Sequence, residues 1–411
     1  MAILTNGSTA PRGPLGTLSV AQILERSQAA NEPAWLTEMR GAAWSAFQQM
    51  EAPKWRRTRL DDLHLETLQL AAHPHAPELL GADKAVEQGV IFIPLRDALA
   101  THADLIGSKM GQGVAPLTNR YSALRAALWQ NGTFLYVPRN VELEAPLHIR
   151  YTLPVGEQAH FPYTLVVVEA NARISLIEEY ISVESAMTTL TGATTELFIG
   201  AGAAIRYASI QQQSRTAYHI GGQVITLDRD ASGEWVSFGL GSKVQHIEAE
   251  ARMQGDGSRI EWHGATFATE QQNLVIVPWL RHIGTATESH LDFKTVVADE
   301  GYSVFDGMIK IERDSHATST RLEEHAIHLT PNSRSDSIPG LMIDTNDVAK
   351  AGHASTSGQV DEEQIFYMQA RGISPADAKR LIVMGFFEAA LNAIPHEITR
   401  EQVAAHIEGR I

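Results

Sequence analysis

The central part of the chain, residues 132–345, consists of short runs rich in Val, Ile, Thr, Phe and Tyr that alternate with turns of small or polar residues. The clearest runs are 133–138, 163–168, 173–177, 234–238 and 258–263. The turns between them cover 170–172, 200–202, 228–233 and 255–257. Their centres recur at roughly 25–30 residues, a period typical of stacked coils. We therefore predict a parallel β-helix, in which each coil buries its faces against its neighbours.

Two other architectures are weighed against this one. Strands that follow one another without helices between them exclude a doubly wound α/β fold. A β-sandwich remains the alternative that the pattern alone leaves open, because short strands with regular turns are also typical of sandwiches.

The first 130 residues are predicted to be a helical N-terminal region. Ser19 and Gln22 fit a capping box at the start of one helix. A second helix carries an apolar stripe at steps of three and four, with Pro53 beyond its end. Residues 90–95 are expected to form a strand and 119–129 a helix, which is followed by Asn131-Gly132 as a turn. The residues of the stripe are Leu36, Met39, Ala43, Phe47 and Met50.

Residues 346–411 are predicted to form a helical C-terminal domain after a β-helix core over 131–345. One helix covers 361–370, with Gly372 in the left-handed position after it. Ser374 caps the next helix, and a last short helix starts near Thr399. This tail could dock on a partner or fold back on its own chain. The predicted apolar face of the middle helix comprises Ala378, Leu381, Ile382, Gly385, Phe386, Ala389 and Ala393.

Charge and composition exclude several classes of protein. The formal net charge is −15, and the longest basic run, 54–57, includes Trp55 and is expected to be an anchoring segment, so we expect no nucleic-acid partner. No run is long and apolar enough to cross a bilayer, and residues 1–16 resemble a disordered lead-in more than a signal peptide. The chain has no cysteine. Nothing therefore indicates an oxidising compartment, and the expected location is the cytoplasm.

No motif of a catalytic site is found. The glycine-rich strings at 107–113 and 200–203 lack the residues that complete a phosphate-binding loop. A G-x-S-x-G nucleophile elbow is absent. Adjacent carboxylates occur at 61–62, 178–179 and 362–363, but neighbouring strand residues face opposite sides, so these pairs are expected to be surface charge.

Histidine is plentiful, with 17 residues, so a metal site has to be considered. His325 and His328 would point to opposite sides of a strand, which argues against a joint site. Four others, namely His73, His75, His282 and His290, are expected to be solvated or satisfied by hydrogen bonds. His353 lies among small residues between the β region and the tail helices. An imidazole there could reach across an interface or ligate iron, although from the residues alone a hydrogen bond within a turn is the favoured explanation.

The run from Asn346 through Gly358 to Tyr367 resembles the signature of the SufB/SufD family of iron–sulfur cluster assembly proteins. It continues in step through 370–373 and the helix over 381–387. Three further stretches, at 304–309, 132–138 and 32–36, resemble the family in the same order along the chain.

The resemblance implies a right-handed parallel β-helix between helical N-terminal and C-terminal segments. It also implies a non-catalytic scaffold, pairing with a SufB-like subunit and docking of a SufC-like ATPase on the C-terminal helices. The residues that it assigns to partner binding are Phe366, Tyr367, Arg371, Gly372, Phe386 and Phe387.

Two departures from the family pattern limit the chemistry of this chain. Without cysteine it cannot be the subunit that accepts sulfur, and Ala351 stands where relatives often carry a thiol. The chain alone is therefore expected to bind no cofactor. An iron–sulfur cluster is possible at the interface with the SufB-like subunit, where His353 is the candidate ligand. Chain length and the lone His353 favour the SufD branch of the family.

Two alternatives remain beside the scaffold. A β-helix enzyme acting on acidic polysaccharide would need clustered acidic calcium ligands beside a basic catalytic residue, and no such cluster is visible. A self-pairing homodimer could replace the heterodimer, because the ends of β-helices are adhesive in either case.

Overall fold

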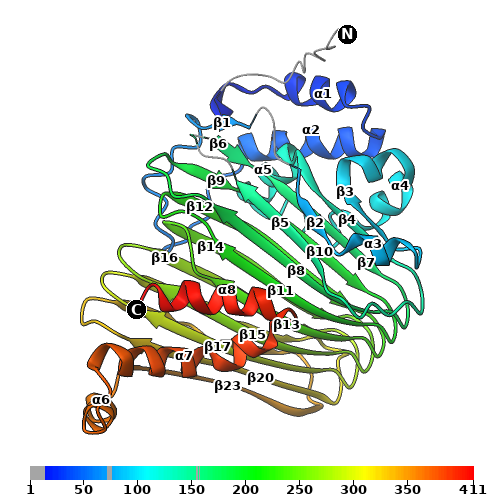
Figure 1. The fold of residues 1–411 in the computed structure, drawn as a ribbon. Helices are drawn as coiled ribbons and strands as arrows, with labels where there is room; N and C mark the ends of the chain where they lie inside the picture. The colour runs from blue at the N-terminus through cyan, green and yellow to red at the C-terminus, as the bar shows by residue number, and fades with distance from the viewer. Residues whose placement is uncertain (1–13, 72–75, 154–155, 157) are drawn as a thin grey trace.

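A parallel β-helix forms the centre of the computed structural model, which describes residues 14–71, 76–153, 156 and 158–411 (Figure 1). Two sheets run along it, one from β3 to β21 and the other from β2 to β23. Strands one coil apart pair in parallel, for example β13 with β15. At the N-terminal end, β3 pairs antiparallel with β4, and β2 pairs antiparallel with β5. The prediction of a β-helix flanked by helices is confirmed, and the β-sandwich alternative is wrong.

The first sheet follows the path β3 (Ile91–Pro94), β4 (Asn131–Val137), β7 (Pro162–Val168), β10 (Thr194–Ile199), β12 (Ala217–Leu227), β14 (Val244–Met253), β16 (Asn273–His282), β18 (Tyr302–Phe305) and β21 (Arg334–Ser337). Short strands beside this path are β1 (Gln69–Leu70), β6 (Gln158–His160), β9 (Thr189–Thr191), β19 (Met308–Ile311) and β22 (Gly340–Ile343). The second sheet contains β2 (Glu78–Leu80), β5 (Leu147–Leu153), β8 (Arg173–Ser182), β11 (Ala204–Gln212), β13 (Ser232–Gly239), β15 (Arg259–Ala268), β17 (Glu288–Val297), β20 (Thr318–His328) and β23 (Val348–Gln359).

One corner of the β-helix is built from a ladder of residues with left-handed backbone. The amide of each of these residues donates to a carbonyl one coil further along. Asn, Asp and Gly adopt a positive φ at least cost, and they occupy most of the positions. The members are Asn140, Asn171, Gly202, Asp230, Gly257, Ala286 and Ala317, about 30 residues apart. Four of these corners fall in turns predicted from the sequence.

The N-terminal helices cover one end of the β-helix (Figure 1). Ser19 and Gln22 form the predicted capping box. The buried Arg40 of the second long helix donates to Glu32 at 2.7 Å and to the carbonyls of Ala127 and Trp129, which fixes this layer to the first coil. The elements are η1 (Leu15–Thr17), α1 (Val20–Ala29), α2 (Ala34–Gln49), α3 (Ala82–Val86), α4 (Leu95–Lys109) and α5 (Arg120–Leu128).

Asn131 and Gly132 are not the predicted turn, because both residues belong to β4. A Cβ atom on Gly132 would lie 2.0 Å from the carbonyl oxygen of Tyr163 in the neighbouring strand. The glycine is therefore needed for the close approach of two backbones within the first coil. The contact with Tyr163 outweighs the turn propensity of Asn131-Gly132, and the local sequence does not reveal it.

Gly132→Ala is expected to lower the free energy of unfolding by about 1–3 kcal/mol or more, since backbone must shift to admit the methyl group. Gly385→Ala is the control. Gly385 is exposed in a helix and a Cβ there would meet nothing within 4 Å, so this change should stabilise by about 0.5–1 kcal/mol. Urea unfolding of both variants measures the difference, and equal effects would contradict the assignment of Gly132.

Glu178 and Glu179, predicted to be surface charge, are buried with 0% and 3% exposure. They do face opposite ways, as predicted for a strand. Glu178 accepts hydrogen bonds inside the β-helix from hydroxyl groups of two threonines and two tyrosines: Thr164, Thr195, Tyr180 and Tyr207. Burial raises the pKa of Glu178, and these hydrogen bonds partly oppose the rise. Glu179 pairs with His148 at 2.7 Å and Arg150 at 3.0 Å. The other two carboxylate pairs are exposed.

The C-terminal helices are α6 (Glu362–Gln369), α7 (Pro375–Ala393) and α8 (Glu397–Glu408). Figure 1 shows α7 and α8 lying across the second sheet, where α7 contacts β13, β15 and β17. The predicted face of α7 was wrong in part. The buried residues are Ala378, Val383, Phe387, Ala390, Leu391 and Ala393, whereas Leu381 is 55% exposed. The last helix begins before Thr399, with His396 as its N-cap.

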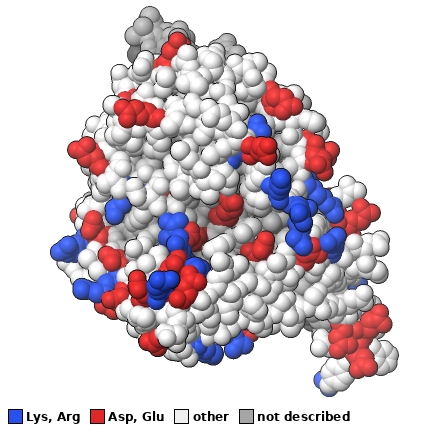
Figure 2. All heavy atoms as spheres, turned by 180° about the vertical axis from the view of Figure 1, so that it is seen from behind, with Lys and Arg blue, Asp and Glu red and all other residues white. Residues whose placement is uncertain are grey.

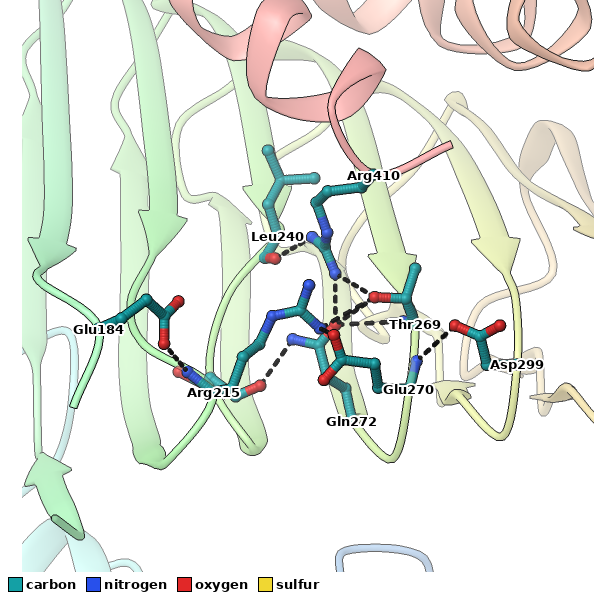
Figure 3. Close-up of polar contacts among 9 residues, drawn as sticks. Glu184, Arg215, Leu240, Thr269, Glu270, Gln272, Asp299 and Arg410 are labelled. Atoms are coloured by element: carbon teal, nitrogen blue, oxygen red, sulfur yellow. Dashed lines mark hydrogen bonds and ion pairs between the residues drawn. The ribbon is translucent and has the colours of Figure 1, made fainter. Parts of the chain in front are cut away.

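Arg410 joins the end of α8 to the rim of the β-helix (Figure 3). Its guanidinium donates to the Leu240 carbonyl, to Thr269 Oγ1 at 2.9 Å and to the Gln272 side chain. Burial, together with the charge of nearby Arg215, lowers the pKa of Arg410 to about 9. The tail therefore folds back on its own domain through α7 and α8.

The basic segment 54–57 is an anchoring segment beside a helix, as predicted, since Trp55 stacks on Tyr121 of α5 with ring centroids 4.9 Å apart. The segment also contacts the β-helix. Trp55 stacks on His246 of β14 with ring centroids 3.6 Å apart, and Arg57 pairs with Asp336 at 3.0 Å. None of the helices in the described part of the chain is both long and apolar enough to cross a bilayer. The lead-in predicted over residues 1–16 falls mostly, and His73 and His75 fall wholly, outside the described residues.

Candidate functional site at the open end of the β-helix

The candidate site is the C-terminal end of the β-helix, where β23 forms the last strand of the second sheet. Among the strands that the structure describes, it pairs only with β20, and most of its residues are exposed. The small-residue stretch 349–358, predicted to lie between the β region and the tail helices, belongs to β23. The β-helix therefore continues past the boundary predicted at 345.

His353 lies in β23 and its side chain is exposed. It is in register with Leu322 of β20, which is 0% exposed inside the β-helix. Residues in register on parallel strands share a face of the sheet. His353 therefore continues a column of inward-facing side chains, and it lies on the last coil, where no further coil of the described chain covers it. The column runs Leu147, Leu176, Tyr207, Trp235, Trp262, Leu291, Leu322 and His353.

Polar side chains lie further along the same two strands, from Glu324 to His328 on β20 and from Ser355 to Ser357 on β23. Ser355 donates to Glu324 at 3.1 Å, and Glu324 is only 1% exposed, so burial raises its pKa. His328 contacts Ser335 at 2.8 Å and Ser357 at 3.1 Å. His325 contacts Thr356 instead. His325 and His328 thus lie in a strand and have separate partners, as expected from their spacing.

The remaining predicted histidines also have polar partners. His282 is 0% exposed and contacts Thr287 and Ser289 at 2.8 and 2.9 Å, and burial lowers its pKa to about 3. His290 lies between Glu261 at 2.7 Å and Glu323 at 3.3 Å. Within the residues that the structure describes, no three His, Asp or Glu side chains form a group able to hold a metal ion.

The residues assigned to partner binding separate into two groups. Phe366 and Tyr367 are 71% and 59% exposed on α6, a helix none of whose residues is buried. Arg371 stacks on the Tyr367 ring at 4.5 Å, and Gly372 has the predicted left-handed backbone, with φ of 86°. In Figure 1, α6 projects from the body of the molecule, and Figure 2 shows acidic residues on this projection.

The two phenylalanines of α7 belong to the second group. Phe387 is 0% exposed and packs against Phe267 of β15 with ring centroids 6.4 Å apart. It is therefore part of the core and does not lie on the surface of the free chain. Phe386 is half-buried, with Lys294 Nζ 5.5 Å from its ring.

Comparison with known proteins decides the family. The model described as "SUF system FeS cluster assembly, SufBD core domain" matches residues 151–386, which is more than half of the chain. The chain belongs to the SufB/SufD family. The model of the SufBD protein N-terminal region matches residues 77–149, so the two models together extend from just before β2 into α7.

Among family members, the chain is 28% identical to the iron–sulfur cluster assembly protein SufD of Bacillus subtilis, over 97% of this chain and 99% of that protein. It is 27% identical to SufB of the same organism, over 79% and 70%. A SufBD family protein of Staphylococcus epidermidis is 25% identical over 95% and 93%. The nearly full overlap with SufD agrees with a SufD-like member of the family.

Proposed function

We propose that this chain is a SufD-type scaffold without an active site of its own. It pairs with a SufB-type subunit through the open end of its β-helix and docks a SufC-type ATPase on its C-terminal helices. The observation that supports this most is the contrast between its two ends. Helices cover the N-terminal end, whereas β23 leaves the C-terminal end uncovered. An unpaired strand edge is a ready template for a second chain.

Co-expression of the tagged chain with a SufB-type and a SufC-type subunit tests the pairing. Both subunits should be retained on the tag at high salt. Size-exclusion chromatography of the chain alone and with the SufB-type subunit then separates the heterodimer from a self-paired homodimer. A chain that retains neither subunit would refute the proposal, and one that elutes as the same dimer in both runs would favour the homodimer.

The proposed interface with the SufB-type subunit could hold an iron–sulfur cluster even though this chain has no cysteine. An exposed imidazole on the last coil can supply one nitrogen ligand to an iron–sulfur cluster, which is the cargo of the assembly family. Since the described residues contain no metal-binding group, thiolates and other ligands would have to come from the partner. His353 would then be a shared-site ligand.

His353→Ala is expected to lower the cluster affinity of the co-expressed complex by about tenfold or more, since loss of even outer-shell groups around a ligating histidine costs that much. Iron and sulfide per complex, measured after identical purification, report the change. His316→Ala, at another exposed histidine of the β-helix, is the matched control. Equal iron in all three complexes, with equal yield of complex, would exclude His353 as a ligand.

A further inference from the structure

A cavity of about 310 Å³ lies between the segment 111–118, which joins α4 to α5, and the strands β12, β14 and β16 of the first sheet. Its size is at the lower end of the range for small-molecule sites. Much of its wall is apolar, with Val114, Val224, Val277 and Trp279 among the lining residues. None of the residues that line the cavity belongs to β23 or to the C-terminal helices, so it is separate from the candidate site above.

Segment 111–118 is held firmly over the sheet. The buried carboxylate of Glu196 accepts the amides of Gly111 at 2.8 Å, Gly113 at 2.6 Å and Val114 at 2.8 Å. Three backbone donors on one carboxylate fix the path of the chain at this point. The outer wall of the cavity is therefore preformed.

Arg125 of α5 lines this cavity and is only 2% exposed. None of its three guanidinium nitrogens has a hydrogen-bond partner among the described residues. Its Nη2 lies so close over Gly222 that a Cβ there would be 2.6 Å away, and a methyl group of Val114 would be 3.0 Å from the same Cβ. A buried guanidinium stays charged and its unpaired donors are costly, so the site lacks an acceptor.

The carboxylates near the cavity do not supply that acceptor. The negative charge of Glu248 acts on Arg125 without a hydrogen bond between them, and both carboxylate oxygens of Glu248 accept from Asn119 Nδ2, at 3.1 and 3.2 Å. Glu250 is engaged by Arg252 at 2.7 Å and Arg281 at 3.9 Å. The Nε atom of Arg252 has no partner in the described chain either. The cavity thus has a surplus of positively charged donors beside acids that are already paired.

We propose that this cavity binds a small organic oxyanion, a carboxylate or a phosphate monoester with an apolar body, whose charged group pairs with Arg125. The apolar body would occupy the space beside Trp279. The side chain of Val114, which lies beside the guanidinium over Gly222, has to rotate to admit the ligand. The site does not depend on subunit pairing or on iron, and so goes beyond the proposed scaffold function.

Isothermal titration of the full chain with phenyl phosphate, benzoate and neutral benzyl alcohol tests the proposal. At least one of the two anions should bind, and benzyl alcohol should bind at least about tenfold more weakly, because its neutral hydroxyl group cannot form an ion pair with the guanidinium. Comparing the two anions distinguishes a phosphate from a carboxylate site. Arg125→Met should weaken the anion by about tenfold or more.

Two further variants complete the experiment. Arg206→Met, at an arginine on β11 that pairs with Glu234, removes the same charge elsewhere and should leave binding unchanged. Gly222→Ala keeps Arg125 but places a methyl group against its guanidinium, and it should weaken binding even if Arg125→Met does not fold. The proposal is overturned if neither anion binds, if benzyl alcohol binds equally well, or if a folded Arg125→Met or Gly222→Ala variant retains wild-type affinity.

Discussion

Replacing Trp235 by alanine is expected to lower the free energy of unfolding by about 3–5 kcal/mol, the usual cost of removing a buried aromatic side chain. Trp235 is 0% exposed. Its ring stacks on that of Trp262 one coil further along, with centroids 3.9 Å apart and an interplanar angle of 5°. Alanine would leave a cavity on one face of Trp262 and would also remove the hydrogen bond from Trp235 Nε1 to Ser209.

The effect should extend beyond the site itself. Each coil of a β-helix contacts only its neighbours, so a weak coil in the middle uncouples those on either side. Urea unfolding gives the loss of stability, and hydrogen exchange should show that β20 and β23 lose protection before β4 and β7. Trp279→Ala on the outer face, where the ring is partly exposed, is the control and should cost less than Trp235→Ala. Equal losses from both variants would contradict a core role for the stack.

The architecture could be predicted because its corners are encoded locally. Asn171, Gly202, Asp230 and Gly257 are residues that tolerate a positive φ, and each lies where the chain turns between coils. Helix starts at Ser19 and Ser374 were likewise predictable, since both N-caps accept a backbone amide three residues ahead. These signals depend on a few neighbouring residues and not on the fold around them.

The incorrect predictions concern residues whose burial or position depends on contacts with segments distant in the sequence. The apolar run 381–387 offers more than one face, and only contact with β13, β15 and β17 selects Val383 and Phe387 for the core. Glu178 is buried because Thr164, Thr195 and Tyr207 from three other strands supply hydroxyl groups. The residues adjacent to an acidic pair in the sequence do not indicate such hydrogen-bond partners. For the same reason His353 could be singled out, but its place on the last coil could not.

The unpaired charge of Arg125 illustrates the same limit. Nothing in the sequence around it separates this arginine from a surface residue of α5. Its significance comes from the sheet strands and from the segment 111–118 that enclose it. Contacts between segments remote in the sequence therefore determine both the core residues that were predicted wrongly and the proposed anion site.

Phe366→Ala is expected to weaken binding of a SufC-type ATPase by about 2 kcal/mol or more, a factor of about 30 in Kd, if α6 provides the proposed docking surface. Its aromatic ring is 71% exposed, and the neighbouring Tyr367 ring is held by Arg371. Exposed aromatic side chains beside an arginine are the residue types that dominate interface energies. Tyr367→Ala should act in the same direction.

Folding of the chain itself should be unaffected by either change, because α6 has no buried residue. Isothermal titration with the purified ATPase measures the affinity, and circular dichroism confirms the fold. Ile398→Ala, at an apolar residue of α8 that is 59% exposed, is the matched control. If Phe366→Ala and Tyr367→Ala bind as tightly as the wild-type chain while Ile398→Ala does not, docking occurs on α8. The projecting α6 would then need another explanation.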